Sequence, residues 1–499
     1  MLIVGAGISG LALARALRQF DIETRILDKR NQHAEAGLAI NLPGNAIQAL
    51  ERLGLKEQVD ALGYPTKRRE YRTAKGKLLF SVNETDFWGE RHQPRCILRS
   101  DLLRILQEGN SQDNLLYGKE VVEISQDAGR VSVALSDNET METACLIGAD
   151  GVNSITRTLA FNGNAVRAAA LSNFSWRFMA PNPGVDCWSL WVGSKSMILL
   201  IPVSEQSVYV WATLTGNRTD SGQVRLSGEH FSDFPSDLRS IIENAVKTPQ
   251  DVYNSPLQEV RMDRWSAGNV LLLGDAAHAT APVWAQGAAL GMEAALTLAK
   301  LVSQKVEQPE LFDQFEKLHR PRVNHVVAMT DKMSKAAKIP SFAQKLLLPI
   351  VGPRNYEATY GPCGTAISDF DQSGSNHSVL TGTAPVAGQP GSAVSCQAFF
   401  CQFIEIVLPE RILLDTELVQ IGPRKQACVV HIVESDAHGI VADGIDPHDL
   451  DIALAANCHT LFRRMALHLR RRRQNTQQFC REVKFLAVVK CHAQQFAVA

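Results

Sequence analysis

Two sets of small and acidic residues, far apart in the chain, could bind the phosphates and sugar hydroxyls of a nucleotide. The first is Gly5-Ala6-Gly7-Ile8-Ser9-Gly10, and the second is Gly274-Asp275, followed by Pro282 and Gln286-Gly287. Glycines let backbone N–H groups approach a phosphate, and a carboxylate at the end of a strand accepts hydrogen bonds from hydroxyls. Together the two sets predict one long dinucleotide held from both ends.

The residues around the first set have the pattern of a strand, a turn and a helix. Leu2-Ile3-Val4 is an apolar run typical of a buried parallel strand, and Leu11–Leu17 contains good helix formers and no proline. Here Gly5 permits the tight turn, Gly7 admits a pyrophosphate, and Gly10 lets the helix pack on the strand. The N-terminus of the helix then offers free N–H groups to the phosphates.

A second predicted strand, residues 24–27, ends at Asp28, and Lys29 follows it. Asp28 lies 23 residues after Gly5, close to the spacing of about 20 expected for an acidic residue that binds ribose hydroxyls. An ordinary strand–helix turn without a ligand is the alternative interpretation. The strand, the helix and Asp28 in register favour a dinucleotide site.

Two later segments favour FAD over NAD. Residues 145–151 form an apolar run that ends in Gly-Ala-Asp-Gly, and residues 269–275 form another that ends in Gly-Asp. A carboxylate at the carboxyl end of a strand faces the crevice where α/β sheets bind ligands, so Asp275 can reach a sugar or ribityl hydroxyl. The helix after Gln286-Gly287 is rich in small residues, and its N-terminus could stabilise negative charge on a reduced flavin ring.

These motifs resemble those of the single-component FAD-dependent aromatic hydroxylases, the para-hydroxybenzoate hydroxylase-like monooxygenases. Residues 5–10 are similar to the first FAD motif of that family, residues 148–151 to its Asp-Gly motif, and Gly274-Asp275 with Pro282 to its Gly-Asp motif. Arg99-Ser100-Asp101-Leu102 resembles a helix start whose arginine reaches the flavin nucleotide. The resemblance covers about residues 1–350. It implies cofactor contacts at Gly5, Gly7, Ser9, Gly10, Asp28, Lys29, Asn41, Arg99, Val121, Asp150, Gly274, Asp275, Pro282, Ala285, Gln286, Gly287, Ala288 and Ala289.

The resemblance also implies a reaction: NADH or NADPH reduces FAD, and one oxygen atom of O2 is then transferred to an electron-rich substrate. The protein orients the substrate and excludes water. Two departures affect this expectation, because Ala285 stands where the family usually has glycine and Ala294 stands where an aspartate often follows Glu293.

The α/β pattern predicts a Rossmann-type FAD-binding domain at residues 1–165 and 266–350, with an inserted β-rich substrate domain at residues 166–265. Short alternating runs at residues 189–192, 197–202 and 207–211 read as strands of the insertion. Candidates for lining a substrate pocket are Trp176, Arg177, Tyr209, Trp211 and Trp284. Core packing is the alternative for each aromatic, and a surface ion pair is the alternative for Arg177.

Composition excludes several other classes of protein. The chain of 499 residues has a net charge of −1, which gives no reason to expect a nucleic-acid partner. It has no apolar run long enough for a membrane span, and a predicted strand at residue 2 leaves no room for a signal peptide, so we expect a cytoplasmic protein. No metal-ligand set or hydrolase motif is recognisable, and His278 is more simply a packed structural residue.

The composition changes after Tyr360. No Tyr or Trp follows it, and seven of the ten cysteines do. Residues 371–395 are rich in Gly, Ser, Thr and Pro and read as a linker, which leaves an extension at 396–499. It could be a thioredoxin-like domain, although no Cys-x-x-Cys is present; a metal module, although no ligand set is recognisable; or sequence joined by a shifted reading frame.

The sequence therefore predicts an FAD-dependent monooxygenase that uses NADPH or NADH and O2 to hydroxylate a small aromatic or electron-rich substrate. One alternative is a flavin oxidoreductase of the same fold that inserts no oxygen. Another is a flavin-binding protein without turnover. The identity of the substrate and the oligomeric state stay open.

Overall fold

The computed structural model describes residues 1–31, 38–111, 113–127, 129–161, 166–168, 175–214, 225–255, 257–336, 341–365, 414–421 and 425–432. The chain divides into two units, Met1–Ala387 and Gly388–Ala499. In the second unit, the described residues form an antiparallel hairpin of β22 (Leu414–Ile421) and β23 (Lys425–Ile432). The predicted linker and the rest of the predicted extension lie outside the described residues.

A six-stranded sheet forms the core of the first unit. In spatial order its strands are β20 (Ser266–Ala267), β21 (Val270–Leu272), β12 (Leu146–Gly148), β1 (Leu2–Val4), β2 (Arg25–Asp28) and β8 (Leu115–Tyr117). All neighbours are parallel except β20 and β21. Such a sheet has the buried apolar strands and the common carboxyl edge of a Rossmann-type domain. The predicted α/β fold is confirmed.

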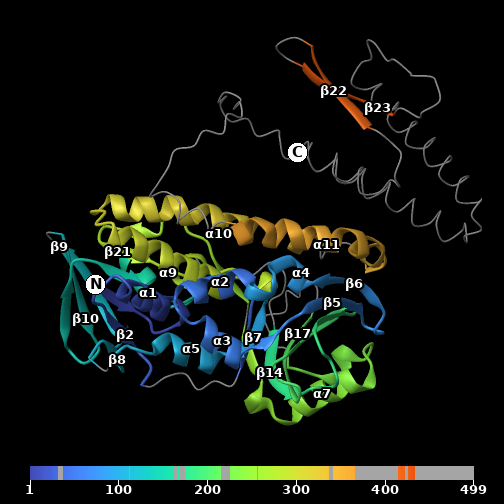
Figure 1. Ribbon diagram of the computed structural model, residues 1–499, viewed down its shortest axis with the longest axis horizontal. Coiled ribbons are helices and arrows are strands. Elements are labelled where there is room, and N and C mark those ends of the chain that lie inside the picture. The colour runs from blue at the N-terminus through green and yellow to red at the C-terminus, as the bar shows by residue number, and fades with distance from the viewer. Residues whose placement is uncertain are drawn as a thin grey trace, which may run out of the picture. The chain divides into compact units, whose positions relative to one another are not determined.

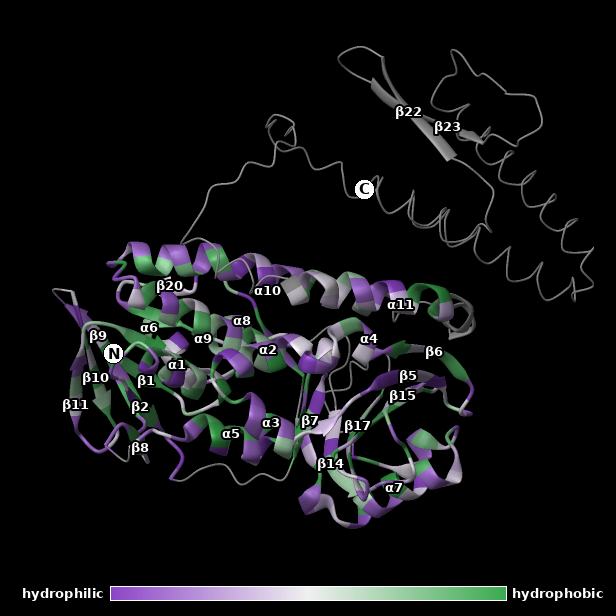
Figure 2. Ribbon diagram, in the orientation of Figure 1, coloured by the Kyte–Doolittle hydropathy of each residue, from purple (hydrophilic) through white to green (hydrophobic). Residues whose placement is uncertain are grey.

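Helices cover this sheet. They include α1 (Ile8–Arg18), α5 (Arg99–Gln107), α9 (Gly287–Ser303), α2 (Gly44–Arg52), α3 (Lys56–Leu62) and α10 (Glu310–Ala336). Helix α9 packs against α1, α2 and α10, and it is buried along most of its length, as its small and apolar residues dictate. Figure 2 shows hydrophobic residues gathered on α9, whereas α10 alternates hydrophilic and hydrophobic residues.

The first unit also contains a separate seven-stranded sheet (Figure 1). Its order is β18 (Tyr253–Ser255), β14 (Ser175–Pro181), β17 (Ser207–Leu214), β16 (Ser196–Pro202), β15 (Trp188–Val192), β5 (Arg68–Thr73) and β6 (Leu78–Asn83). Helix α7 (Ser236–Lys247) packs on one face of it. Strands β5 and β6 come from residues that the sequence analysis assigned to the FAD-binding domain. The predicted insertion at 166–265 therefore omits two strands of its own sheet.

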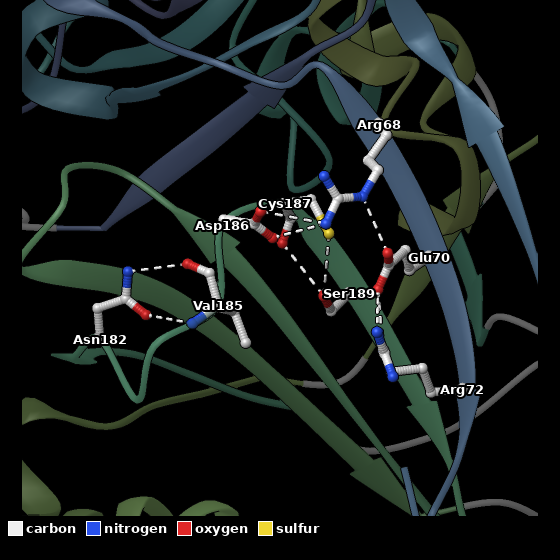
Figure 3. A network of polar contacts seen from close by, with 8 residues as sticks. All are labelled: Arg68, Glu70, Arg72, Asn182, Val185, Asp186, Cys187 and Ser189. Carbon is white, nitrogen blue, oxygen red and sulfur yellow. Dashed lines mark hydrogen bonds and ion pairs between the residues drawn. The ribbon is translucent and has the colours of Figure 1, made fainter. Parts of the chain in front are cut away.

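Polar contacts join β5 to the chain that precedes β15 (Figure 3). Arg68 pairs with Glu70 at 2.9 Å and with Asp186 at 2.8 Å, and Arg72 pairs with Glu70 from the other side. Because alternate residues of a strand share a face, these three side chains of β5 form one ladder. The ladder lies beside the parallel pairing between β5 and β15, two strands that are distant in sequence.

The remaining elements connect these layers. They are β3 (Ala39–Leu42), β7 (Arg95–Leu98) and β4 (Tyr64–Pro65) in one small sheet; β9 (Val121–Asp127), β10 (Arg130–Leu135) and β11 (Thr140–Thr143) in another; and β13 (Val166–Ala168) with β19 (Gln258–Val260). Short helices are α4 (Glu84–Trp88), α6 (Ile155–Ala160) and α8 (Asp275–His278), with single turns at η1 (Glu90–His92), η2 (Gly228–Phe231), η3 (Pro249–Asp251) and η4 (Pro282–Trp284).

Helix α11 (Ser341–Thr365) follows α10 and returns along it. Arg322 of α10 contacts residues 362 and 363, while His325 contacts Thr359, so the two helices are antiparallel. Both lie along the same side of the first unit in Figure 1. Among the residues that the structure describes, no helix combines the length and the apolar character needed to cross a bilayer.

Candidate flavin site

Three motifs that are far apart in sequence meet at one edge of the six-stranded sheet. Val4 pairs with Gly148, and Gly148 pairs with Leu272, so the turns after β1, β12 and β21 are neighbours at the carboxyl ends of parallel strands. Ligands of open α/β sheets bind at this edge. The register therefore brings together Gly5, Asp150 and Asp275.

The turn between β1 and α1 needs glycine at two positions for reasons internal to the protein. Gly5 has a φ of +106°, and a Cβ added there would lie 2.5 Å from the carbonyl oxygen of Ala149. A Cβ added at Gly10 would overlap the carbonyl oxygen of Gly5. These two glycines therefore let α1 start directly over the end of the strand.

Gly7 differs from them because nothing in the protein requires it. A Cβ at Gly7 would come no closer than 4.0 Å to the neighbouring described atoms, and its φ of −86° suits any residue. Gly7 is the N-cap of α1, and the first turn of α1 contains no acidic residue. An uncapped helix start with open space beside its glycine is the arrangement that receives a phosphate.

Ser9 packs between two of the motifs. A Cβ added at Gly274, where φ is +61°, or at Gly291 of α9 would overlap the Ser9 hydroxyl. The Ser9 side chain therefore fills the space that these two glycines leave. It fixes α1 against the turn after β21 and against α9.

Asp28 lies at the end of β2 with its carboxylate facing the glycine turn. It accepts hydrogen bonds from the Ala6 N–H at 2.7 Å and from the Arg30 side chain at 2.8 and 2.7 Å, and its fourth partner is the Arg30 N–H at 2.9 Å. Burial alone would raise the pKa of Asp28, but these hydrogen bonds hold it below its usual range. Because all four acceptor positions are in use, Arg30 must release one before Asp28 can bind a ribose hydroxyl.

Asn41 of β3 has a buried amide without a protein partner. The residue is 7% exposed, and neither its Oδ1 nor its Nδ2 has a hydrogen-bond partner among the described residues. An unpaired buried amide costs free energy, so native proteins rarely keep one without a function. A bound ligand with both a donor and an acceptor would satisfy it.

Arg99 and Asp275 bring opposite charges to the same region. Burial lowers the pKa of Arg99, and the nearby Arg30 charge lowers it further while Asp275 opposes the shift. Asp275 is exposed, yet the protein around its carboxylate removes enough water to raise its pKa, against the effect of Arg99. This combination is typical of a carboxylate inside a concave site. No hydrogen bond or ion pair of the Arg99 side chain is found within the described part of the chain.

The loop that joins α8 to α9 contains the remaining predicted residues. Pro282 is exposed at the start of η4, and Ala285 has a left-handed backbone with a φ of +53°. The side chain of Gln286 turns inward and exchanges two hydrogen bonds with Asn45, at 2.9 and 3.1 Å. Only the backbone of Gln286 is thus left to contact a ligand.

Helix α9 begins next to Asp275. A Cβ added at Gly287 would lie 3.6 Å from Oδ1 of Asp275, and the Gln286 side chain does not cap the helix. Ala288 is partly buried, whereas Ala289 is fully buried in the core. The N-terminus of α9 therefore presents N–H groups close to Asp275.

Three further predicted cofactor residues have other surroundings. The Asp150 carboxylate accepts hydrogen bonds from Ser154 at 2.6 Å and from the Thr156 N–H at 3.0 Å, so it supports the start of α6. Val121 is buried in an apolar cluster with Val4 and Leu27, and Lys29 is exposed beside Asp28. Asp150 and Val121 therefore leave their backbones, more than their side chains, as ligand contacts, whereas the Lys29 side chain is open to solvent.

The pocket candidates of the seven-stranded sheet divide between its two faces. Arg177 pairs with Trp211 across β14 and β17, whereas Trp176 pairs with Ala212 on the opposite face. Trp176 is 1% exposed and packs against Phe231 in the cluster under α7. That position argues against the predicted role of Trp176 in a pocket.

The other face holds Arg177, Tyr209 and Trp211 and is directed toward the FAD-binding domain. Tyr209 belongs to a cluster with Ala39 of β3, and Trp211 packs against Leu257 and Ala281, the residue before Pro282. The Trp211 Nε1 is buried without a partner among the described residues. Burial raises the pKa of Tyr209 to about 12, so its hydroxyl stays protonated.

Trp284 and His278 are both packed. Trp284 is 4% exposed in a cluster with Trp88 and Tyr360. His278 is buried, with its ring centroid 4.9 Å from that of Trp265, and burial lowers the pKa of His278 to about 4. These contacts favour the structural interpretation of His278.

Sequence reasoning missed several residues of the site. Arg30 occupies the acceptor positions of Asp28, Asn45 holds Gln286 across 241 residues of sequence, and Tyr253 lies 5.3 Å below the guanidinium of Arg177. Tyr253 also interacts electrostatically with Arg99. Arg30, two residues after Asp28, could have been identified by its spacing, because alternate residues can face the same side. No local pattern signals the other two.

The residues at this edge fit a flavin dinucleotide. Two uncapped helix N-termini and two arginines, Arg30 and Arg99, suit the diphosphate and an anionic ring. The unpaired amide of Asn41 and the open carboxylate of Asp275 suit hydroxyl and ring polar atoms. Among the described residues, no cluster of His, Cys, Asp and Glu could hold a metal ion.

Comparison with known proteins identifies relatives of this chain. The family model described as "FAD binding domain" matches residues 1–330. The 2-heptyl-3-hydroxy-4(1H)-quinolone synthase of Pseudomonas aeruginosa is 28% identical over 326 residues, which cover 63% of this chain and 84% of that protein. The FAD-dependent urate hydroxylase of Mycolicibacterium vanbaalenii is 29% identical over 315 residues, which cover 60% of this chain and 78% of that protein.

A solved structure has the same fold. The crystal structure of Klebsiella pneumoniae HpxO complexed with FAD and uric acid matches with a TM-score of 0.64 at 24% sequence identity. The match covers 74% of this chain and 96% of that one. At this level of identity the likeness establishes the architecture.

Proposed function

This chain belongs to the FAD-binding-domain family, and on that premise we propose that it is an FAD-dependent monooxygenase. It would use NADPH or NADH and O2 to hydroxylate a small aromatic or similarly electron-rich compound. The relatives named as a quinolone synthase and a urate hydroxylase support oxygenation of a nitrogen heterocycle or a related ring.

One observation carries the proposal. The turns after β1, β12 and β21 meet at the carboxyl edge of a parallel sheet, and an unpaired, buried Asn41 amide lies in the adjoining small sheet. A structural role would explain the glycines at positions 5 and 10, but not the open space at Gly7 or the unsatisfied Asn41. A bound dinucleotide accounts for both.

The residues divide into binding and orienting roles. The N-terminus of α1 and the Arg30 and Arg99 side chains would hold the diphosphate, and Asp275 would accept hydrogen bonds from hydroxyls of the flavin chain. The N-terminus of α9 would stabilise negative charge on the ring. When bound, FAD supplies the electron transfer and the activation of O2, which no side chain can supply.

The face of the seven-stranded sheet that holds Arg177, Tyr209 and Trp211 would form one wall of the substrate pocket. Its polar groups are the Trp211 Nε1–H, the Tyr209 hydroxyl, kept protonated by burial, and the Arg177 guanidinium. The indole and the guanidinium can only donate hydrogen bonds, so they favour a planar substrate that presents acceptor oxygens or nitrogens. The aromatic rings would exclude water from the reacting atoms.

Oxygen consumption tests this function directly. The purified protein, supplied with FAD and NADPH or NADH, is screened against hydroxylated aromatic acids and nitrogen heterocycles while O2 uptake and product are measured. The proposal predicts one hydroxylated product for each O2 consumed with an accepted substrate. Turnover that produces oxidised or reduced substrate without incorporation of oxygen from ¹⁸O2 would favour the non-oxygenating flavin oxidoreductase instead.

A further inference from the structure

The loop from Trp284 to Gln286 contains a strained residue at its centre. Ala285 has a φ of +53° and a ψ of +31°, in the left-handed region that disfavours residues with a Cβ. Such strain persists only where the surroundings impose it. The residues on either side of Ala285 show what imposes it here.

On the N-terminal side, Tyr360 of α11 holds the backbone of Trp284. The Tyr360 hydroxyl donates a 2.6 Å hydrogen bond to the Trp284 carbonyl, which belongs to the peptide bond that enters Ala285. Tyr360 is fully buried, and its oxygen accepts a hydrogen bond from Arg69 at 3.2 Å. Arg69 pairs in turn with the buried Glu84. The hydroxyl is therefore fixed from both sides.

On the C-terminal side, a chain of buried polar groups holds Gln286. Its side chain pairs with Asn45, and Asn45 donates to Glu293 of α9 at 2.8 Å. Glu293 forms an ion pair with Arg322 of α10 at 3.1 Å. Every member of this chain is less than 10% exposed.

Both sets of buried polar contacts, the one at Trp284 and the one at Gln286, end on the last turn of α11. Arg322 donates to the carbonyls of Pro362 and Cys363, close to the end of the helix at Thr365. The last carbonyls of a helix lack partners within the helix and attract a cation, so Arg322 caps α11. One segment, residues 360–363, therefore braces the peptides before and after Ala285.

We infer that the last turn of α11 positions the flavin-facing loop, with Tyr360 and Arg322 as the positioning residues. The inference rests on the proposed function, in which the N-terminus of α9, which this loop leads into, stabilises negative charge on the flavin ring. By holding Ala285 in a strained conformation, the turn fixes the direction in which α9 begins and hence the N–H groups offered to the ring. Tyr360 itself contacts the loop and not the ring.

Affinity for FAD in the full-length protein tests this inference. Tyr360→Phe removes the hydrogen bond to Trp284 and keeps the ring, so we expect the dissociation constant for FAD, measured by flavin fluorescence on reconstituting the apoprotein, to rise about tenfold. Tyr356→Phe is the matched control. Tyr356 lies one turn earlier and is also buried. It bonds Trp88 and Glu84, the partner of Arg69, so Tyr356→Phe perturbs the same buried network but keeps the hydrogen bond from Tyr360 to Trp284. We expect Tyr356→Phe to change FAD affinity less than about twofold.

A second substitution separates positioning from general stability. Glycine adopts the left-handed conformation without strain, so Ala285→Gly removes the need for bracing. In the double variant, Tyr360→Phe should then weaken FAD binding less than about twofold relative to Ala285→Gly alone. If Tyr360→Phe folds poorly, Arg322→Lys replaces it, because lysine cannot reproduce the paired guanidinium hydrogen bonds that cap α11. Its loss of FAD affinity should likewise be reduced when Ala285→Gly is present.

Two outcomes would overturn the inference while the proposed function stands: equal effects of Tyr360→Phe and Tyr356→Phe, or a loss in Tyr360→Phe that glycine at position 285 leaves unchanged. A wild-type protein that binds no FAD would overturn the proposed function and this inference with it. The wild-type titration therefore distinguishes the two failures.

Discussion

Among single residues, Gly7 and Gly10 differ in the space that surrounds them at the start of α1. Gly10 lies against the carbonyl oxygen of Gly5, whereas Gly7 faces open space. We expect Gly10→Ala to lower the melting temperature of the apoprotein, because the new methyl group overlaps backbone. Gly7→Val should lower the apoprotein melting temperature less than Gly10→Ala does, because its Cβ meets no atom closer than 4.0 Å and only the N-cap preference for glycine is lost, and it should abolish FAD binding.

Thermal melting of the apoproteins and FAD titration of each variant check this pair. A Gly7→Val protein that binds FAD normally would contradict the assignment of the pyrophosphate to the start of α1. A Gly7→Val apoprotein that melts as low as Gly10→Ala would show that Gly7 is needed for packing.

Asp275 supplies a second test at the residue scale. Its carboxylate lies beside the N-terminus of α9 and interacts with Arg99, and no other acidic side chain is predicted to bind the flavin chain there. Asp275→Ala should purify largely free of flavin, and Asp275→Asn should retain part of it because the amide oxygen still accepts a hydrogen bond. The ratio of flavin absorbance to protein absorbance measures both. Full yellow occupancy in Asp275→Ala would remove the role given to this residue.

Among the elements, the join between β5, α4 and α11 depends on one buried ion pair. Arg69 is 2% exposed and Glu84 is 0% exposed, and three aromatic rings lie 5.1–5.4 Å from the Arg69 guanidinium. Removing one partner of a buried pair leaves an uncompensated charge. We therefore expect Glu84→Gln to lower the free energy of unfolding by about 3–5 kcal/mol.

The surface ladder of the same strand provides the control. Asp186, which pairs with Arg68 in Figure 3, has a side chain that is 72% exposed. Asp186→Ala should therefore cost about 1 kcal/mol or less in the same denaturant titration. Similar losses in the two variants would mean that Arg69 and Glu84 are not buried as described.

Local sequence pattern predicts the individual strands and motifs of the site, but not how distant segments pack together. The glycine turn, Asp28 and the three motif strands follow from runs of four to ten residues, and the parallel register then brings them together. The alternation in β14 predicts that Trp176 and Arg177 face opposite ways, but it cannot say which face meets the cofactor domain. That depends on α7 covering the Trp176 face.

Contacts between distant segments account for the rest. Residues 68–83 contain two strands that join a sheet formed mainly by residues 175–255, a pairing that no local feature announces. The resemblance predicts that Gln286 contacts the flavin, but its side chain exchanges hydrogen bonds with the buried Asn45, which also donates to Glu293. Ala285 is the exception: its departure from glycine was visible in the sequence, and it proves to be the strained residue.

At the scale of the whole molecule, two buried histidines make stability depend on pH. Burial lowers the pKa of His278 to about 4 and that of His319 well below the ordinary value of 6.5. Between pH 6.5 and about 4 the unfolded chain binds a proton at His278 and the folded protein does not, and the lowered pKa of His319 acts in the same direction. Acidification through this window therefore favours unfolding, and alkalinisation restores stability.

The melting temperature of the protein should fall steadily as the pH is lowered from 7 to 5. His278→Phe, which keeps a ring beside Trp265, should show a shallower fall over the same range, because one of the two groups no longer binds a proton on unfolding. Parallel slopes for wild type and variant would contradict the assignment of His278 as a buried neutral group.

The central claim is that the carboxyl edge of the six-stranded sheet binds an FAD that accepts electrons from a pyridine nucleotide. The visible spectrum of the purified protein, recorded with FAD before and after anaerobic addition of NADPH and then NADH, tests it most directly. The account predicts protein-bound flavin absorbance that bleaches with at least one of the two donors. A protein that remains colourless after incubation with FAD, or bound flavin that neither donor reduces in the presence or absence of aromatic substrates, would contradict it.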